Sequence, residues 1–244
     1  MQDTSGDSIF IPLMSILIDT KKVFIIVPAF NEYAAIKQVV NDLLSFQYNV
    51  VVVDDGSETS LYSLLENLDV TILRHPVNLG QGAALQTGIE FALSNQAEYI
   101  VTFDADGQHQ ASDIAKLLQP LLNNEADITL GSRFIKGAYH NMAAKRKILL
   151  QVGRRLNYLL TGILLTDAHN GLRAMNRKAA SNIQISENGM AHATEFLTQI
   201  KKNKLRHKEV PVTIHYTTYS KNKGQTAWGS FRIFFDLLLN KIFK

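Results

Sequence analysis

Two aspartates separated by one residue give the clearest chemical signal in this sequence. Asp104 and Asp106 follow an apolar run, Tyr99 to Phe103, that is typical of a buried strand. At a strand end this spacing brings two carboxylates close to one point, and Mg²⁺ and Mn²⁺ prefer oxygen ligands of this kind. Gln108 could add a neutral oxygen ligand. A metal ion held here would neutralise the charge that grows on a departing diphosphate.

A second pair of aspartates follows another apolar run. Asp54 and Asp55 come directly after Val50–Val53 and are followed by Gly56. Asp55 could accept hydrogen bonds from a base or ribose, and Gly56 would let the chain turn closely. The alternative for both aspartate pairs is a plain turn or helix cap, because Asp favours such positions. Their place after strands, together with the motifs below, favours a binding site.

A glycine-rich segment, Asn78-Leu79-Gly80-Gln81-Gly82-Ala83-Ala84, opens a predicted helix. The N-terminus of a helix presents N–H groups and the positive end of the helix dipole, so Gly82 is a candidate for binding an anion such as phosphate. The spacing of the glycines differs from the G-x-G-x-x-G that a dinucleotide-binding fold needs. A nicotinamide-dependent enzyme is therefore disfavoured.

Several basic and titratable residues follow in the second half of the chain. Arg133, Arg146 and Arg173 lie in or after the region of the strand ends. Arginine is the usual fork for phosphate oxygens, although each of these could also be a solvated surface charge. His192 and Glu195 share one face of a predicted helix at i, i+3. They are either a pair facing a pocket or part of a solvated helix face.

These residues need a scaffold that brings strand ends together. Buried apolar runs alternate with helical periodicities, and this rhythm predicts an α/β fold with a mostly parallel, doubly wound sheet. In such sheets ligands bind beyond the carboxyl ends of the strands. Asn31 could cap the first helix. The predicted strands are 23–27, 50–53, 70–73, 99–103 and 128–130, and the helical patterns are 35–44, 61–68, 82–93 and 112–122.

The pattern changes after Arg133. We expect a helix at 148–165, a strand at 172–175, a helix at 190–202 and a strand at 210–216. A polar, basic loop at 219–226 precedes a final helix with a wide apolar face. This face suits an interface with a membrane, or it packs on the domain or on a second subunit. The expected organisation is an N-terminal extension at 1–20, the main domain at 21–226 and a C-terminal amphipathic helix at 227–244.

Composition narrows the classes of function. The chain has 244 residues, 46% of them hydrophobic, so it can bury a core and is not disordered. The net charge is +3 (25 basic less 22 acidic residues), and from His140 to Lys178 Asp167 is the single acid. A basic surface suits phosphates, anionic lipid or nucleic acid, but no recognition motif for nucleic acid is present. The lack of cysteine excludes disulfides, and no run is long enough to span a bilayer.

Six ordered motifs resemble those of family-2 glycosyltransferases. They are most similar to the branch that includes dolichyl-phosphate mannosyltransferase and bacterial polyprenyl-phosphate glycosyltransferases. The match runs from about Val23 to about Thr226. The motifs are Val27-Pro28-Ala29-Phe30-Asn31-Glu32, Val53-Asp54-Asp55-Gly56-Ser57, Asn78-Leu79-Gly80-Gln81-Gly82, Asp104-Ala105-Asp106-Gly107-Gln108-His109, Gly131-Ser132-Arg133 and Asn170-Gly171-Leu172-Arg173-Ala174.

The resemblance implies a GT-A fold, a nucleoside-diphosphate sugar donor, inversion at the anomeric carbon and a divalent metal, Mg²⁺ or Mn²⁺. By matching motif, Asp104, Asp106 and Gln108 would hold the metal, and Arg133 would face an acceptor phosphate. The donor site would include Pro28, Phe30, Glu32, Asp54, Asp55 and Gly82, with Lys221 and Lys223 from a mobile basic loop. Arg173, His192 and Glu195 complete the candidate catalytic set.

The sequence also departs from the family pattern. Gln81 stands where many relatives carry a lysine, and Phe30 replaces a frequent tyrosine. The long membrane-spanning tail of many relatives is missing. No QxxRW-like motif occurs, which disfavours a processive polysaccharide synthase. A catalytically silent sugar-nucleotide binding module is disfavoured by the intact Asp104 and Asp106.

The chemistry of inversion distinguishes two classes of acceptor, a lipid phosphate and a sugar hydroxyl. A lipid phosphate is already anionic at neutral pH, so its transfer needs positioning and electrostatics but no general base. A sugar hydroxyl needs a base, and His192, Glu195 or Asp167 could serve. We expect a polyprenyl phosphate acceptor and a cytoplasmic enzyme, peripheral at the inner face of the membrane, that could form a homo-oligomer. The alternatives are transfer to a sugar hydroxyl in cell-surface polysaccharide assembly, or a sugar nucleotidyltransferase.

Overall fold

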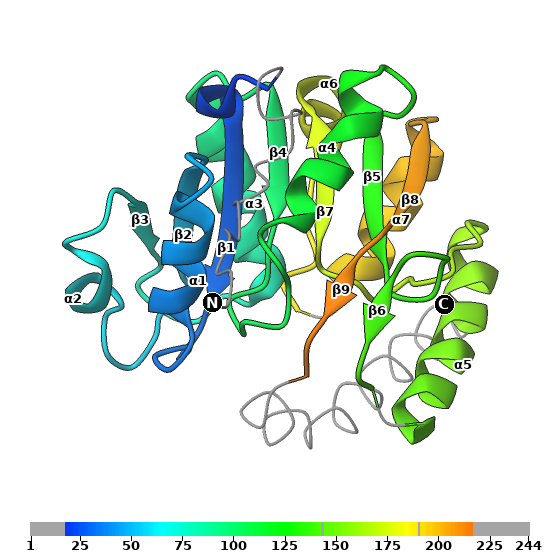
Figure 1. Cartoon of the computed structure of the whole chain (residues 1–244), viewed down its shortest axis with the longest axis horizontal. Helices are drawn as coiled ribbons and strands as arrows, with labels where there is room; N and C mark the ends of the chain where they lie inside the picture. Colours follow the sequence, from blue (N-terminus) through cyan, green and yellow to red (C-terminus); the bar gives the residue numbers. More distant parts are fainter. Residues whose placement is uncertain (1–17, 143, 190, 217–244) are drawn as a thin grey trace, which may run out of the picture.

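A twisted sheet flanked by helices on both faces forms the centre of the molecule (Figure 1). The computed structural model describes residues 18–142, 144–189 and 191–216. The residues predicted to form the basic loop at 219–226, with Lys221 and Lys223, and the final helix lie outside the described residues, as do the first seventeen.

The described part of the chain has a seven-stranded sheet with the order β3-β2-β1-β4-β7-β5-β8. All neighbouring strands in it are parallel except β7, which runs antiparallel to both β4 and β5. A small parallel pair, β6 and β9, lies beyond one edge of the sheet. The strands are β1 Val23–Ala29, β2 Asn49–Asp54, β3 Thr71–Arg74, β4 Tyr99–Thr102, β5 Ile128–Ser132, β6 Tyr139–His140, β7 Arg173–Asn176, β8 His207–Pro211 and β9 Thr213–Ile214.

The helices cover both faces of the sheet because each strand sends alternate side chains to opposite sides. In β1, Val23, Ile25 and Val27 enter one core with α1 and α4, while Phe24 and Ile26 enter a second core with α3, α6 and α7. Helix α5 lies at the far end from β3 (Figure 1). The helices are η2 Thr20–Lys22, α1 Ile36–Leu44, α2 Tyr62–Leu65, α3 Gln81–Ser94, α4 Asp113–Leu122, α5 Ala144–Thr161, α6 Arg177–Asn182 and α7 His192–Lys202.

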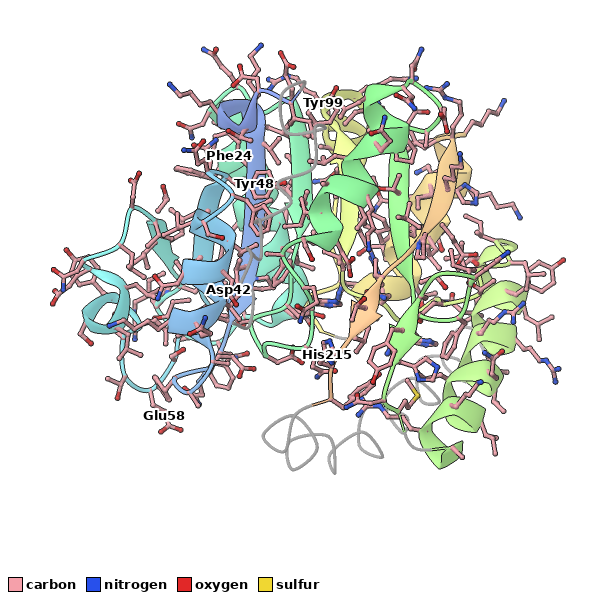
Figure 2. All side chains as sticks on the ribbon, in the orientation of Figure 1. Phe24, Asp42, Tyr48, Glu58, Tyr99 and His215 are labelled. Atoms are coloured by element: carbon pink, nitrogen blue, oxygen red, sulfur yellow. The ribbon has the colours of Figure 1, made fainter. Side chains whose placement is uncertain are left out.

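The strand directions place the polar motifs at one edge of the sheet. Phe24 and Tyr99, near the amino ends of β1 and β4, lie at the opposite edge from His215 (Figure 2). The parallel strands β1, β2, β4 and β5 therefore all end at the edge where β9 leads to His215. Because β7 is antiparallel, its first residue, Arg173, begins at this same edge, opposite Thr102.

The predicted mostly parallel sheet flanked by helices is confirmed, with differences at particular elements. The predicted strand 210–216 falls on two strands, the end of β8 and β9. Val212, between them, still donates its N–H to Ser132 O of β5 at 3.1 Å, and Thr213 and Ile214 then pair with β6 instead of β5. Helix α5 begins and ends earlier than predicted. It ends before Gly162, whose positive φ of 68° is typical of a helix C-terminus. Asn31 does not cap α1: its side-chain oxygen accepts from the Glu58 N–H at 3.0 Å.

Among the described residues, no helix has the length and apolar character required to cross a membrane.

We expect Gly88→Ala to lower the free energy of unfolding by about 1–3 kcal/mol, the typical cost of overpacking. Gly88 lies where α3 packs on β1, and a β-carbon there would overlap the Ile26 side chain. Helix propensity alone would favour alanine by about 1 kcal/mol, so a net loss measures the steric contact. Urea unfolding gives the comparison, with Gly189→Ala as control because nothing lies within 4 Å of a β-carbon there. Equal stability of both variants would contradict the close approach of α3 to β1.

Candidate active site

A cleft of about 410 Å³ opens at the carboxyl edge of the sheet, between the ends of β1, β2 and β4 and the start of α3. This volume lies in the range of small-molecule sites. The structure brings most of the predicted donor and metal residues together here. The cleft is lined by Pro28, Ala29, Phe30, Glu32, Asp55, Asn78, Gly80, Gln81, Ala84, Asp104, Ala105 and Asp106.

Asp104 lies within a set of polar and cationic groups that favour its charged form. His109 Nε2 donates to its Oδ2 at 3.0 Å, and Gln81 Nε2 donates to its Oδ1 at 3.3 Å. Burial raises the pKa of Asp104, but the hydrogen bond from His109 and the nearby charge of Arg173 outweigh it and hold the pKa below its usual value. A β-carbon at residue 171 would overlap the carboxylate, so glycine is required there.

Asp106 has the opposite electrostatic environment. Burial and then the charge of Asp104 raise its pKa, and Glu32 adds to this effect. The Gln108 N–H donates to Asp106 Oδ1 at 3.0 Å, and the Gln108 side-chain amide also donates to the Asp106 carboxylate. Gln108 thus supports Asp106 and is not among the residues that line the cleft.

The two carboxylates fit a divalent cation. They repel each other at one side of a cleft, and a cation between them would relieve that repulsion. In the part of the chain that the structure describes, no three His, Cys, Asp or Glu residues gather as a closed metal site. A metal bound by Asp104 and Asp106 would therefore complete its coordination with water and substrate oxygens, as Mg²⁺ commonly does.

Asp54 and Asp55 have different tasks. Asp55 Oδ1 and Oδ2 accept from the N–H groups of Leu79 and Gly80 at 2.9 and 2.8 Å, and Oδ1 also contacts His75 Nδ1 at 2.7 Å. Asp55 thus holds the glycine-rich turn at the cleft that it lines. Asp54 is fully buried and is not a lining residue.

The hydrogen-bond partners of Asp54 come from the loop after β2 and from the neighbouring strand β3. Its carboxylate accepts from the Ser57 N–H at 2.9 Å, the Leu61 N–H at 3.2 Å and Arg74 Nη1 at 2.5 Å. Hydrogen bonds and the Arg74 charge keep its pKa low although burial acts to raise it. The structure therefore places Asp54 at the end of β2, where it holds the following loop, and not among the residues that line the cleft.

Gly82 also serves packing. Its N–H donates to Asn188 O at 2.8 Å, and a β-carbon there would overlap Glu187 O. The N–H group that we predicted for an anion is thus bound to a backbone carbonyl. The start of α3 reaches the cleft through Gly80 and Gln81.

His192 and Glu195 both contact the turn formed by residues 186–189. They do not form a pair facing the cleft. Glu195 accepts from the Ser186 N–H at 3.1 and 3.0 Å and from the Glu187 N–H at 2.9 Å. His192 Nδ1 contacts Gly189 O at 2.8 Å. Burial, with the charge of Arg173, lowers the pKa of His192.

Arg133 is buried in an internal network. Its Nε and Nη2 donate to the two oxygens of Asp167 at 2.5 and 3.1 Å, and Nη1 contacts the Tyr216 hydroxyl at 2.6 Å. Nη2 also donates to His169 O at 3.3 Å. Each guanidinium nitrogen thus has a partner within the protein. The geometry favours a structural role for Arg133 over the predicted direct contact with a phosphate.

Two further arginines contact aromatic rings. Arg173 lies 4.5 Å from the Phe196 ring centroid, and burial lowers its pKa to about 10 against the opposing effect of Asp104 and Asp167. Arg146 lies 4.6 Å from the ring centroid of Tyr216. Arg173 supplies positive charge near Asp104 without lining the donor cleft.

A second pocket, of about 460 Å³, lies between α5 and the segment around β6. The sequence showed its basic residues as a charged stretch but gave no sign that they face a cavity. Arg154 Nε is buried and has no hydrogen-bond partner among the described residues. The lining residues are Arg133, Phe134, Ile135, Ala138, Tyr139, His140, Lys147, Gln151, Arg154 and Thr166.

Residues 166–172 connect the two cavities. Thr166 lines the second pocket, Asp167 binds Arg133, and Gly171 lies against Asp104 of the donor cleft. Gly153 of α5 packs against His169 in the same segment. The sequence motif Asn170–Ala174 signalled this region, but its link to a basic pocket required the tertiary structure.

The comparisons with known proteins agree with this geometry. The family model described as glycosyl transferase family 2 matches residues 24–184. The UDP-N-acetylglucosamine–dolichyl-phosphate N-acetylglucosaminyltransferase of Methanococcus voltae is 36% identical over 246 residues, which cover 92% of this chain and 98% of that protein. An uncharacterized protein of Methanocaldococcus jannaschii is 37% identical over 230 residues, or 93% of this chain and 95% of that one.

The fold is also similar to solved structures. Glucosyl-3-phosphoglycerate synthase from Mycobacterium tuberculosis, crystallised with Mn²⁺, UDP and glucosyl-3-phosphoglycerate, superposes with a TM-score of 0.63 and 17% sequence identity. The match covers 80% of this chain and 71% of that one. At this identity the similarity concerns the fold.

We expect Arg133→Ala to lower the free energy of unfolding by about 3–5 kcal/mol, since it leaves the buried Asp167 charge without its partner. Urea unfolding measures the change. Lys22→Ala is the matched control: it breaks an ion pair with Glu98 whose two side chains are about half exposed, so it should change stability little. If Arg133→Ala is as stable as the wild type and loses only acceptor use, Arg133 contacts the acceptor directly.

Proposed function

The chain belongs to glycosyl transferase family 2 and has the GT-A fold, and from this membership we propose that it transfers a sugar from a nucleoside-diphosphate sugar to a polyprenyl phosphate, with inversion at the anomeric carbon. The observation that carries the proposal is the pair Asp104 and Asp106 at the strand end inside the cleft. The resemblance found in the sequence to this family is thereby confirmed. The acceptor, the metal and the roles of individual residues are argued below.

The nucleoside of the donor would lie at the β1–β2 side of the cleft. Phe30 is 42% exposed there and offers a flat apolar face for a base. Asp55 fixes the turn that bears Asn78 and Gly80, so these groups are already in place before the donor binds. Glu32 lines the same cleft, between this region and Asp106.

The diphosphate would lie between the start of α3 and the two aspartates. Asp104 and Asp106 would hold Mg²⁺ or Mn²⁺, and the bound ion would stabilise the negative charge that develops on the leaving diphosphate. Gln81 donates to Asp104, which orients one of the two carboxylates. Lys221 and Lys223 are further candidates for contacts with the diphosphate, outside the described residues.

The second pocket suits an anionic acceptor. Lys147 and Arg154 line it, and one buried nitrogen of Arg154 has no partner among the described residues. Residues 166–172 run from Thr166 in this pocket to Gly171 beside Asp104, so an acceptor phosphate held here would contact the same segment as the proposed metal site. A relative 36% identical to this chain bears a name that includes dolichyl phosphate as acceptor.

The hydrogen bonds of the candidate general bases also favour a phosphate acceptor over a hydroxyl acceptor. A hydroxyl acceptor needs a base within hydrogen-bond reach. Glu195 is bound to backbone N–H groups, Asp167 to Arg133 and His192 to a backbone carbonyl. A phosphate needs no deprotonation, so these residues can hold the structure while charge and position drive the transfer. A lipid acceptor would place the reaction at a membrane surface, and we propose that this is the inner face of the membrane.

We expect Asp104→Ala and Asp106→Ala each to reduce transfer at least about a hundredfold, because the leaving diphosphate loses its counter-charge. The assay uses a panel of UDP- and GDP-sugars, Mn²⁺ or Mg²⁺, and a polyprenyl phosphate. Calorimetry of Mn²⁺ binding in the presence of UDP provides a second measurement, which should show lost affinity. Asp42→Asn is the control, since Asp42 is an exposed acid of α1 outside the donor cleft. Full turnover by the alanine variants, or by the wild type after chelation, would refute the metal site.

We expect Lys147→Gln and Arg154→Gln each to raise the acceptor KM by about ten- to a hundredfold, the usual effect of losing a hydrogen bond to a charged group. The affinity for UDP with Mn²⁺ should stay unchanged, because neither residue lines the donor cleft. Lys202→Gln, at the exposed end of α7, is the control. Equal losses of donor and acceptor binding would place the phosphate elsewhere.

A further inference from the structure

Helix α5 differs from the other long helices in what it exposes. The fully exposed positions of α1, α3, α4 and α7 are all polar or charged. On α5, Ile148, Val152 and Leu159 are 66%, 45% and 76% exposed. Their spacing of four and seven residues places them on one side of the helix, in a stripe about 17 Å long at 1.5 Å per residue.

Basic residues border this stripe. Lys147 and Arg155 are exposed on the same helix, and no acidic residue occurs between Lys136 and Asp167. Long basic side chains can lay their methylene groups along an apolar surface and keep their charge in water. An apolar stripe with a purely cationic border fits the interface of an anionic lipid bilayer.

The neighbouring side of α5 faces the acceptor pocket. Gln151 and Arg154 line it, and Lys147 lines it from the border of the stripe. Gly153 packs the helix against the segment that reaches Asp104. The same helix therefore presents an apolar surface outward and an anion-binding pocket inward. A lipid phosphate at a bilayer surface needs both, because its chain stays among lipid tails while its headgroup must reach the enzyme.

We propose that the outward face of α5, formed by Ile148, Val152 and Leu159 with Lys147 and Arg155, docks on the surface of an anionic lipid bilayer and aligns the acceptor pocket with lipid headgroups. This inference rests on the proposed lipid-phosphate acceptor. It is independent of the final helix predicted at 227–244. A protein partner would more often present acidic groups to match this border, but a bilayer supplies both the apolar interior and the anionic surface in one partner.

The first test compares vesicle binding of full-length variants. The probes are vesicles of phosphatidylcholine and of phosphatidylcholine with phosphatidylglycerol, used in co-sedimentation at low and high salt. We expect the wild type to bind the anionic vesicles, more weakly at high salt, because the cationic border contributes. The triple variant Ile148→Ser, Val152→Ser, Leu159→Ser should bind about tenfold less.

The matched control is Tyr62→Ser with Val77→Ser. These two side chains are each 59% exposed. Tyr62 is the first residue of α2 and Val77 follows β3, and both of these elements lie at the far end of the molecule from α5 (Figure 1). The control should bind as the wild type does. Binding of the triple variant equal to the wild type, or no binding of the wild type to anionic vesicles, overturns the proposal.

A second measurement does not depend on the triple variant folding. The chain contains no cysteine, so Leu159→Cys accepts a single environment-sensitive fluorophore. Its emission should shift to the blue when anionic vesicles are added, whereas the same label at Val77→Cys should not shift. Equal responses at both positions overturn the proposal. The proposal is also overturned if sedimentation velocity shows the wild type to be a dimer and the triple variant a monomer, while neither protein binds vesicles.

A short-chain, water-soluble polyprenyl phosphate separates this inference from the proposed function. We expect the triple variant to use this acceptor as the wild type does, and to lose only the use of long-chain acceptor in vesicles. If neither protein uses the short acceptor but vesicle binding depends on α5, the acceptor is wrong and the docking surface stands. If both use it and vesicle binding is unchanged in the triple variant, the docking surface is wrong and the acceptor stands.

Discussion

The buried ion pair between Arg133 and Asp167 connects the parts of this molecule that must act together. Arg133 follows β5, and Asp167 begins the segment that leads to β7. Two buried charges are stable only when their geometry is good and their remaining hydrogen-bonding groups are satisfied. Here the guanidinium also contacts Tyr216 and His169 O, and Glu209 of β8 accepts from the Thr166 and Asp167 N–H groups. The segment 166–172 is therefore held from both sides.

That segment in turn determines the surroundings of Asp104. Gly171 approaches the carboxylate so closely that any side chain would displace it, and Thr102 donates to Gly171 O at 2.6 Å. Arg173 follows immediately and brings a buried positive charge near a carboxylate that His109 also supports. Asp106 accepts hydrogen bonds from Gln108, but burial and the charge of Asp104 outweigh them, so Asp106 is the carboxylate whose charge is disfavoured. The electrostatic asymmetry of the pair arises from the chain that crosses behind Asp104, and a metal ion would complete the balance.

Helix α5 is attached to the same segment through Gly153 and His169. Its inner side is constrained by this contact and by the basic pocket, whereas its outer side packs on no described core cluster. A helix in this position can present apolar residues outward without weakening the sheet, because no described side chain of α5 belongs to either core cluster. Helix α5 can thus serve both the proposed acceptor pocket and the proposed contact with a membrane surface, whereas the cleft at Asp104 is formed by the edge of the sheet.

The sequence by itself determined the sheet, the family and the gathering of acidic residues in a cleft at one edge of the sheet. Continuous apolar runs of strand length predict buried parallel strands, and parallel strands must end at one edge, which is why Asp55, Asp104 and Asp106 could be placed together from their positions alone. Motif spacing could not tell which of two adjacent aspartates faces the cleft. Asp54 and Asp55 differ in the direction of the side chain, which alternates along a strand end. Their partners are Arg74, the last residue of β3, and His75, which follows it. Likewise, Glu195, Gly82 and Arg133 were assigned to chemistry by residue type, whereas the structure uses them to hold backbone or another charge. Such contacts join residues far apart in the chain, so local pattern carries no signal for them, and only the tertiary structure decided their partners and the pocket beside α5.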